Sequence, residues 1–594
     1  MSKNILVSVA WPYSSAHIHV GNITGSYLPA DIFARFQRLR GNRVIMVSGS
    51  DSHGTPVTVA ADQEGVSPFE IYERYHLEFL DIFQKLGLTY DLYTSTHTEN
   101  HFKVAQSIFL ALKENGYLYT DTEKQWYSET QSRFLPDRYV EGICYICGFE
   151  GARSDQCDNC GNLLEANQLI NPRAKTDGST PVLRDTEHFY LDLAKLEQPI
   201  VEYLEARQDY WRSNVVRQSL GWIKAEGLRG RPITRDLDWG IPVPVEGWQG
   251  KCLYVWFEAV IGYLSASIEW SQINGEGDAW HDWWYDPEAQ AYYFIGKDNI
   301  PFHAIMWPAQ LYGAGEWFGK IFEERDDQRL TLPYDVPANE FMNLEGRRLS
   351  GSRNWVVDAL DFLSRYDPDS LRYYLTANMP ESRDSDWDWE DFLNRNNNQL
   401  VATWGNLVNR VLSFAHKHWD GRVPIPGELR PDDNEILTTV EAGFESVGEF
   451  LAAVKLRAAL SEAMRLASQV NKYLDQAAPW FEIKSDKKAA ASTVYTALRA
   501  IDSLKILLAP TLPFTCERLH TYLGYSEPLF GEQAVETRRD DLGEHSVLRY
   551  LPQEATGRWE PSQLPPGQPL REPKPLFRKL DREIVEQERA KLGT

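Results

Sequence analysis

The first 22 residues of this chain hold the side chains with the clearest chemical use. An apolar run over residues 5–10 leads into a polar segment that closes with His19, Gly21 and Asn22. Apolar residues follow at helical spacing, so an imidazole and an amide stand at the start of a predicted helix. Helix starts favour anions because their backbone N–H groups are unpaired and carry partial positive charge. We therefore expect this loop to bind a phosphate-bearing ligand.

Two later apolar runs repeat this layout. Val44–Val47 leads to Asp51, and Tyr292–Ile295 leads to Lys297 and Asp298. All three runs are short and rich in β-branched or aromatic residues, which is typical of strands covered on both faces of a parallel sheet. If they share one sheet, the polar groups at their carboxyl ends converge on one edge, where open α/β sheets bind ligands. Taken singly, each polar residue also fits an ordinary helix cap or solvated loop.

Four of the six cysteines form two C-x2-C pairs, and their spacing predicts a metal site. The pairs are Cys144 with Cys147 and Cys157 with Cys160. Four thiolates at this spacing close a tetrahedron around Zn2+, each about 2.3 Å from the metal. Because the protein fills all four positions, we expect one structural zinc ion and not a catalytic one. Two disulfides or free thiols are the alternative, which a reducing cytosol disfavours.

A glycine- and serine-rich loop at residues 339–355 carries three arginines, Arg347, Arg348 and Arg353. Guanidinium groups and free backbone N–H groups both bind anions. From the residues alone, an anion site and a solvated basic loop are equally good interpretations.

The elements that must position these groups change character along the chain. Short strand patterns alternate with helical ones up to about residue 388, and residues 66–116 read as helical. Beyond that point the helical runs are long, and no strand pattern interrupts them; they cover residues 391–416, 433–451, 454–476 and 491–509. We predict an α/β domain with a parallel sheet, followed by an all-α bundle.

Composition narrows the class of protein. The 594 residues are too many for one core, so several domains are expected. A formal net charge of −24 argues against indiscriminate binding to DNA or other nucleic acids, although a local basic track is compatible with it. No segment approaches the length of apolar chain, about 20 residues, that spans a bilayer. We expect a cytoplasmic protein without a membrane anchor.

Taken together, these motifs resemble those of the methionyl-tRNA synthetases, a family of class I aminoacyl-tRNA synthetases. His19-Val-Gly-Asn22 is similar to the HIGH signature and Arg348-Leu-Ser-Gly-Ser352 to the KMSKS signature. Further family-like stretches are Ala10-Trp-Pro-Tyr13, Asp51-Ser-His-Gly-Thr-Pro56, Phe134-Leu-Pro-Asp-Arg138, Phe294-Ile-Gly-Lys-Asp298 and Ala478-Pro-Trp480. The four-cysteine knuckle also matches. The resemblance covers essentially the full chain, and seven signatures in the family's order make it specific.

The resemblance implies roles for individual residues. The catalytic set would be His19, Asn22, Lys297, Arg348, Ser350, Gly351 and Ser352, and ATP would meet His19, Gly21, Asn22, Lys297, Asp298, Arg348 and Gly351. Methionine would lie among Ala10, Trp11, Tyr13, Asp51, Trp256, Ala259, Tyr263, Ile300 and His303, with Asp51 on its α-ammonium. Asn406, Arg410, Pro479 and Trp480 match positions that read the CAU anticodon, and Cys144, Cys147, Cys157 and Cys160 would bind zinc.

The resemblance also implies a domain plan, in which a Rossmann-like catalytic domain is split by a connective insertion. Its limits would be 1–116 for the first catalytic half, 117–225 for the insertion with its zinc knuckle and 226–325 for the second half. The KMSKS-like loop and stem-contact region would span 326–388, the anticodon-binding bundle 389–540, and a C-terminal tail with a helix 541–594.

The implied reaction is methionine–tRNA ligation in two steps. Methionine and Mg2+-ATP would form methionyl-adenylate and pyrophosphate, and the methionyl group would then pass to the 3′ end of tRNA(Met), for translation initiation and elongation. Positioning and charge stabilisation would carry catalysis, since neither step needs a protein nucleophile. The chain stops soon after the bundle, so we expect a monomer.

One departure from the family stands out. The fourth position of the KMSKS-like loop is Gly351 where the family has lysine, and the first is Arg348. Our hypothesis is that Arg348 or Arg353, with backbone N–H groups at Gly351, replaces the missing cation.

Three other functions compete with this one. A synthetase for isoleucine, valine or leucine would carry a large editing insertion, and too few residues separate the early and late strands to hold it. A non-charging, tRNA-binding paralogue is compatible with a degenerate loop at Gly351. A generic zinc-ribbon nucleic-acid binder would not need three polar strand ends.

Overall fold

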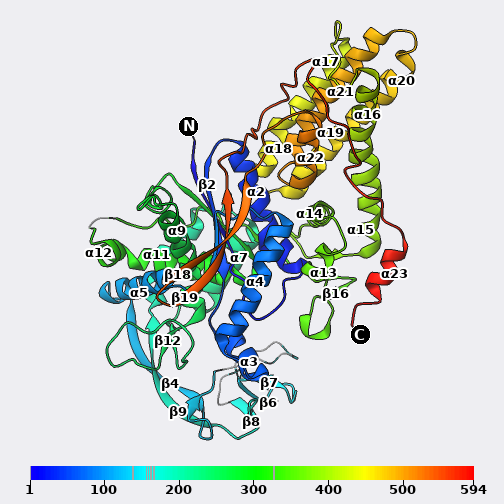
Figure 1. Cartoon of the computed structure of the whole chain (residues 1–594). Helices are drawn as coiled ribbons and strands as arrows, with labels where there is room; N and C mark the ends of the chain where they lie inside the picture. The colour runs from blue at the N-terminus through cyan, green and yellow to red at the C-terminus, as the bar shows by residue number, and fades with distance from the viewer. Residues whose placement is uncertain are drawn as a thin grey trace.

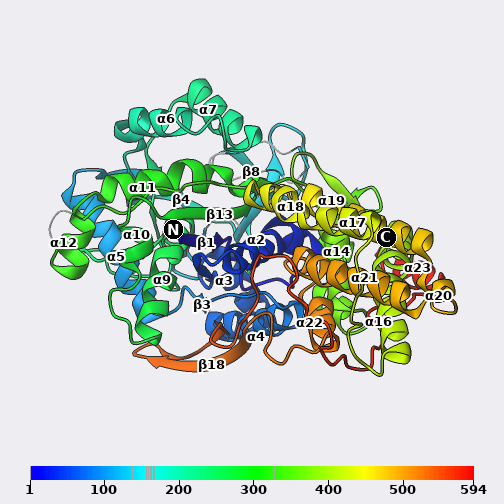
Figure 2. The ribbon, with the colours of Figure 1, turned by 90° about the horizontal axis from the view of Figure 1, so that it is seen from above.

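A computed structural model describes residues 2–136, 139–154, 157, 159–160, 164, 168–325 and 328–593. A body built around one sheet carries a helical bundle that extends from one side (Figure 1). In Figure 2, viewed from above, the sheet and the helices that cover it form the left part of the molecule, and the bundle forms the right part. No helix of the described residues combines the length and the apolar character that crossing a membrane requires.

A seven-stranded sheet forms the centre of the body, in the order β14-β13-β1-β2-β3-β19-β18. The strands from β14 to β3 run parallel, whereas β19 is antiparallel to both β3 and β18. Their bounds are β1 Asn4–Val9, β2 Arg43–Ser50, β3 Leu92–Ser95, β13 Gln290–Gly296, β14 Ala338–Asn339, β18 Glu532–Asp540 and β19 Gly543–Leu551. The three apolar runs of the sequence are thus β1, β2 and β13, and they are direct neighbours.

Helices cover both faces of the sheet. Because side chains alternate along a strand, Ile5 and Val7 of β1 enter the core on one face and Leu6 enters the core on the other. The first face packs against α2 and α4, and the second against α5, α9 and α11. The bounds are α1 Val20–Asn22, η1 Ile23–Tyr27, α2 Leu28–Leu39, α3 Thr55–Glu64, α4 Pro68–Leu86, α5 Glu99–Glu114, α8 Val255–Glu258, η5 Ala259–Ile261, α9 Gly262–Ile273, α10 His281–Trp284, η6 Lys297–Asn299, η7 Phe302–Met306, α11 Trp307–Ala314 and α12 Trp317–Glu323.

Between α5 and α8 the chain builds a separate set of elements. The long antiparallel pair β4 (Leu118–Ser128) and β9 (Val182–Leu191) projects from the body. A small sheet at its far end consists of β6 Val140–Cys144, β7 Ala152–Arg153 and β8 Leu169–Ala174. The four cysteines of the knuckle lie on or near this sheet. Short strands β5 Arg133–Phe134, β10 Arg231–Pro232, β11 Thr234–Arg235 and β12 Cys252–Leu253, with η4 Leu193–Leu196, α6 Glu197–Glu205 and α7 Ser213–Glu226, complete this part.

The predicted all-α bundle is confirmed. Its helices are α15 Trp389–Arg395, η9 Asn396–Gly405, α16 Asn406–His418, α17 Pro431–Glu441, α18 Gly443–Ala452, α19 Leu456–Ala477, α20 Pro479–Glu482, α21 Lys487–Leu508 and α22 Pro513–Tyr522. Between body and bundle lie β15 Met342–Leu344, β16 Arg347–Arg348, η8 Gly351–Arg353, α13 Ala359–Leu363, α14 Pro368–Ala377 and β17 Ser385–Trp387. One continuous apolar core runs from β1 through α14 into the bundle.

The structure differs from the sequence prediction in two places. Residues 92–95 form β3 inside a stretch that was predicted to be helical. The strand was not recognised because four residues are too few to show a strand period. The bundle does not extend to 540, since residues 532–551 form the hairpin β18–β19, which joins the edge of the central sheet. Its outer strand mixes exposed and partly buried positions and many of its residues are charged, so it lacks the apolar signal of a buried strand. The chain then runs along the bundle to α23 (Glu583–Arg589), beside α15 (Figure 1).

Arg372 of α14 is fully buried and ties the body to the bundle. Its Nη2 donates to Oδ2 of Asp31 in α2 at 2.6 Å and to the Pro510 carbonyl at 2.9 Å, and its Nε donates to the Thr511 carbonyl. Burial alone would raise the pKa of Asp31, but the charges of Arg35 and Arg372, together with two hydrogen bonds from Thr89, lower this pKa to about 2. The carboxylate is therefore ionised, and it depends on both guanidinium groups.

We expect Arg372→Ala to lower the free energy of unfolding by about 3–5 kcal/mol, because it leaves the Asp31 carboxylate short of a buried partner. The urea midpoint of unfolding measures this effect. Arg43→Ala is the control, since it breaks a half-exposed pair with Asp282, and such pairs contribute little. Equal midpoints for the two variants would contradict the role given to Arg372.

Candidate active site and metal site

A cavity of about 630 Å³ opens at the carboxyl edge of β1, β2 and β13. His19, Asp51 and Asp298, which follow these three strands, all line it. The structure therefore brings together the groups that the strand ends predicted. Of the residues implied by the family resemblance, those that line the cavity are Ala10, Trp11, Tyr13, His19, Gly21, Asn22, Asp51, Trp256, Ala259, Tyr263, Asp298, His303 and Arg348.

The first loop holds His19 in one orientation at the start of α1. The Gly21 N–H donates to Nδ1 of His19 at 3.1 Å, and the His19 N–H donates to Oδ1 of Asn22 at 3.1 Å. Since Nδ1 accepts, the ring proton of the neutral imidazole sits on Nε2 as a donor. Burial lowers the pKa of His19. A Cβ on Gly21 would come within 2.6 Å of Leu349, so glycine here lets the arginine-rich loop approach.

Aromatic groups form one end of the cavity. The Tyr263 hydroxyl lies 2.7 Å from Nε2 of His303, whose Nδ1 lies 3.0 Å from the Asn299 carbonyl. A carbonyl only accepts, so Nδ1 carries the proton and Nε2 accepts from Tyr263. Burial lowers the pKa of His303 to about 4, which keeps this wall neutral at physiological pH. The Trp11 ring lies so close to Gly49 that a Cβ there would fall 2.1 Å from it.

Asp51 supplies an unpaired carboxylate oxygen inside this cavity. Its Oδ1 is buried and has no hydrogen-bond partner in the described part of the protein. Burial first, and the nearby charge of Glu258 second, raise the pKa of Asp51 well above its usual value. A cationic group in the cavity would satisfy this oxygen and restore the charged form.

A buried network that was not predicted from the sequence lies behind Asp51. Glu258 accepts at Oε1 and Oε2 from the rings of His53 and His101, each at 2.8 Å. Burial would raise the pKa of Glu258, but the two histidines lower it. The sequence gives one signal for this network, His53, which follows directly after the Asp51 strand end.

Several residues implied by the resemblance lie outside the cavity lining. Ile300 is fully buried, and Nζ of Lys297 bonds Glu340 and Asp384, each at 2.7 Å. Ser350 and Gly351 belong to the loop next to the cavity but do not line it. The side chain of Ser352 lies outside the described residues, as do Asp137 and Arg138 of the Phe134 motif.

The arginine-rich loop is fastened at both ends by the C-terminal segment. Arg589 of α23 donates Nε and Nη2 to Glu345 at 3.1 and 2.9 Å. At the other end, Asn354 donates to the Lys591 carbonyl at 3.1 Å and accepts from the Gly593 N–H at 2.9 Å. Between these anchors, Arg348 reaches the cavity lining, whereas the exposed Arg353 does not.

The four cysteines of the knuckle converge. Their sulfur atoms all lie within 4.8 Å of one another, with Cys144 and Cys160 at 3.9 Å and Cys147 and Cys157 at 3.6 Å. A tetrahedron with metal–sulfur bonds of 2.3 Å has edges of about 3.8 Å, so the donor set fits a zinc ion. The separations are far from the roughly 2.05 Å of a disulfide, which excludes the alternative of two disulfides.

The four residues matched to anticodon reading meet at one end of the bundle. Asn406 is exposed, and Arg410 lies over the Trp480 ring at 4.4 Å and pairs with Asp475 at 3.0 Å. Pro479 is buried at the start of α20, and the indole of Trp480, the next residue, is half-buried. An indole, a guanidinium and an amide together suit the stacking and hydrogen bonding of unpaired bases.

Comparison with known proteins gives the class and then the family. Residues 5–412 match the family described as tRNA synthetases class I (M), and residues 423–544 match the anticodon binding domain of methionyl tRNA ligase. Fold and site therefore define a class I aminoacyl-tRNA synthetase. The full length also matches curated relatives closely, and the chain belongs to the methionyl-tRNA synthetase family.

The similarity extends over whole chains. Methionine–tRNA ligase of Thermomicrobium roseum is 55% identical over 594 residues, which is 100% of this chain and 99% of that protein. The enzyme of the same name from Roseiflexus castenholzii is 52% identical, again over 100% and 99%. A crystal structure of Mycobacterium tuberculosis methionyl-tRNA synthetase bound by methionyl-adenylate superposes with a TM-score of 0.75 at 23% identity, covering 97% of this chain and 100% of that one, and supports the fold.

The state of Asp51 leads to a prediction about pH. We expect an amino acid whose α-ammonium meets Asp51 to bind more weakly as the pH falls through the raised pKa of this group, because only the carboxylate attracts the cation. Glu258→Gln removes the nearby negative charge and should shift this loss to lower pH. Asp51→Asn should weaken binding at least about 30-fold at neutral pH and remove the dependence.

Amino-acid binding measured by calorimetry between pH 5 and pH 8 checks this prediction. Tyr75→Phe is a control, since Tyr75 is not part of the cavity lining. An unchanged pH profile in Glu258→Gln would contradict the coupling between the two carboxylates.

Proposed function

We propose that this chain is a methionine–tRNA ligase, which activates L-methionine with ATP and transfers the methionyl group to tRNA(Met). The observation that carries the proposal is the unpaired Asp51 oxygen in a cavity with an aromatic wall on one side and the His19 helix start on the other. The family of the chain supplies the substrates. One cavity thus offers a site for an ammonium, a site for an apolar side chain and a site for phosphates.

Methionine fits the aromatic end of the cavity. Its α-ammonium would meet Asp51, and its unbranched thioether would lie against Tyr263 and His303. A thioether is apolar and polarisable and makes favourable contacts with aromatic rings. The neutral His303–Tyr263 pair presents no charge to it. Trp11, Tyr13, Trp256, Ala259 and Ala10 would complete this pocket, and Ile300 would support it from behind.

ATP fits the other end. We assign its phosphates to the helix start at His19, Gly21 and Asn22 and to Arg348, with Asp298 nearby. Mg2+ enters with ATP as part of the substrate and neutralises phosphate charge. Lys297 is held by Glu340 and Asp384, and it would have to exchange these partners to reach a phosphate.

Catalysis needs no protein nucleophile in this scheme. The methionine carboxylate attacks the α-phosphorus of ATP, and pyrophosphate leaves. The chain contributes the alignment of the two substrates and donors for the charge that develops, from His19 Nε2 and Arg348. The adenylate is then attacked by a hydroxyl at the 3′ end of tRNA(Met), whose CAU anticodon would lie against Asn406, Arg410, Pro479 and Trp480.

The knuckle would hold one structural zinc ion through Cys144, Cys147, Cys157 and Cys160. With four protein ligands no position remains for a substrate, so the ion fixes the small sheet β7-β6-β8 and takes no part in the chemistry. The domain limits stated from the sequence remain proposals; residues 532–551 pair with the edge of the central sheet, although the match to the anticodon binding domain runs to residue 544. A cytoplasmic monomer remains a prediction.

Amino-acid-dependent exchange of pyrophosphate into ATP tests the proposed function. We expect methionine to support exchange and isoleucine, valine and leucine not to, because the aromatic pocket suits the thioether. A non-charging paralogue would show no exchange with any amino acid. Either that outcome or a preference for a branched side chain would overturn the proposal.

The same assay tests which arginine replaces the missing lysine. We expect Arg348→Ala to lower the exchange rate by about 10²–10³-fold, by analogy with the loss of an oxyanion donor. Arg353→Ala is the matched control, since this arginine lies on the same loop but outside the cavity lining. Unchanged exchange in both variants would discard the replacement.

A further inference from the structure

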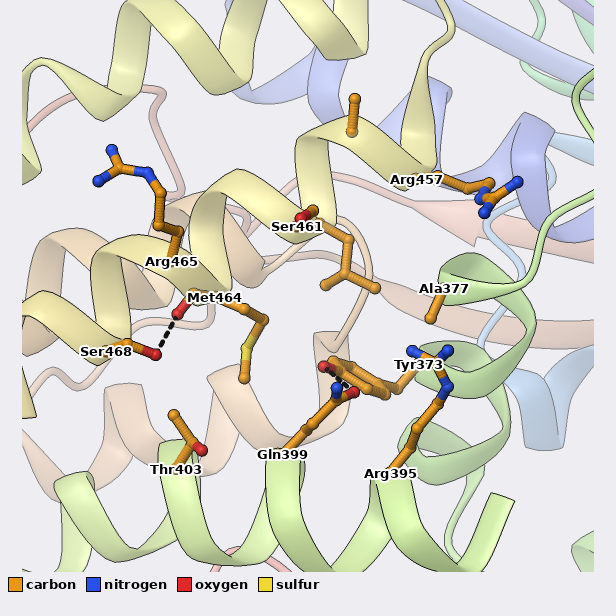
Figure 3. A pocket seen from close by; sticks show the side chains of 12 residues that line it. Tyr373, Ala377, Arg395, Gln399, Thr403, Arg457, Ser461, Met464, Arg465 and Ser468 are labelled. Atoms are coloured by element: carbon orange, nitrogen blue, oxygen red, sulfur yellow. Dashed lines mark hydrogen bonds between the residues drawn. The ribbon is translucent and has the colours of Figure 1, made fainter. Parts of the chain in front are cut away.

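A second cavity of about 630 Å³ lies at the junction of body and bundle. Side chains of α19 face those of α15 and η9 across it, and α14 closes one end (Figure 3). Three guanidinium groups belong to its lining, from Arg395, Arg457 and Arg465. The cavity is distinct from the one at the sheet edge, and the functional assignments above do not use it.

The charges of this cavity are only partly neutralised. Arg395 pairs with Asp391 at 2.8 Å, and Arg465 forms two bonds with Glu462 at 2.7 and 2.8 Å. Within the described residues, the guanidinium of Arg457 donates no hydrogen bond and forms no ion pair. Its backbone N–H donates to Glu381, a carboxyl whose pKa is raised by burial despite the nearby charge of Arg457. One cation therefore remains available in a half-enclosed space.

Gln399 and Ser461 add donor groups to the lining, whereas the Thr403 and Ser468 hydroxyls donate to backbone carbonyls of their own helices. The buried Tyr373 hydroxyl donates to Oε1 of Gln399 at 2.8 Å, and this bond directs the Gln399 amide N–H groups away from Tyr373 (Figure 3). The Ser461 hydroxyl is exposed beside them. Guanidinium, amide N–H and hydroxyl donors around one space match a ligand that only accepts, such as a phosphate.

The cavity lies on the same helix face as the predicted anticodon end. On α19, Arg457, Ser461, Ser468 and Asp475 follow one another at intervals of four or seven residues, which places them on one face. Asp475 pairs with Arg410 at 3.0 Å, and so marks the anticodon end of this stripe. At 1.5 Å per residue, the stripe is about 27 Å long.

We propose that this cavity binds backbone phosphates of the RNA whose anticodon the bundle binds, with Arg457 as the principal contact. The inference rests on the proposed function, and it assigns a phosphate site that the anticodon residues do not include. The protein carries a net charge of −24, so a polyanion needs a local cationic site on it. A site on the same stripe as the anticodon end would orient the RNA without reading its sequence.

Binding of tRNA(Met) over a series of salt concentrations tests the proposal. We expect Arg457→Gln to weaken binding several-fold at low salt and to reduce the slope of log K against log salt by about one, as loss of a phosphate contact does. The factor should be the same for a tRNA with an altered anticodon, because phosphates carry no sequence. Ser461→Asp, which adds a negative charge to the cavity, should weaken binding further.

Arg329→Gln is the matched control, since it removes the same charge from an exposed arginine of the body that is remote from the cavity. Thermal unfolding shows whether each variant is folded. Methionine-dependent pyrophosphate exchange, which needs no RNA, should stay at the wild-type rate in all three variants.

The outcomes separate the two proposals. An unchanged salt slope in both Arg457→Gln and Ser461→Asp, with exchange intact, overturns the phosphate site and leaves the ligase function standing. Loss that appears only with the cognate anticodon also overturns it, since the contact would then read bases. Absence of exchange in the wild-type protein is a failure of the proposed function itself.

Discussion

The parallel pairing of β1 with its two neighbours is the constraint on which the site depends. Val9 of β1 lies level with Phe294 of β13, and Ser8 lies level with Val47 of β2. Because three strands run in one direction and in this register, the loops that follow them open on the same edge. A shift of one residue would turn every side chain of a strand to the opposite face, so two buried cores fix the register.

Burial sets the electrostatics of the cavity. It lowers the pKa of the His19 and His303 imidazoles and raises the pKa of the Asp51 carboxyl, so burial favours the uncharged form of all three groups. Behind the cavity, Glu258 keeps its charge because two histidines bond it. Under the proposed function, Asp51 would meet one cation and the helix start one polyanion.

Long-range contacts join this site to the bundle. The buried Arg372 binds α2 of the body and the segment after α21, and one apolar core continues across the junction. The C-terminal segment returns from the bundle to fasten the loop that carries Arg348, through Glu345 and Asn354. Packing therefore fixes the position of the bundle relative to the sheet edge. A substrate that must reach both places requires such a fixed position.

The sequence by itself determined the parallel α/β body, the all-α bundle, the cysteine quartet and the three polar strand ends, because each depends on residues close together in the chain. It could not show the Glu258 network or the anchoring of the loop by α23, since their partners are more than 150 residues apart and have no common period. It also missed β3 and the hairpin β18–β19, whose place in the sheet is decided by neighbours and not by composition. Tertiary structure alone decided which arginine of the loop reaches the cavity, because that depends on where the loop is held and not on the order of its residues.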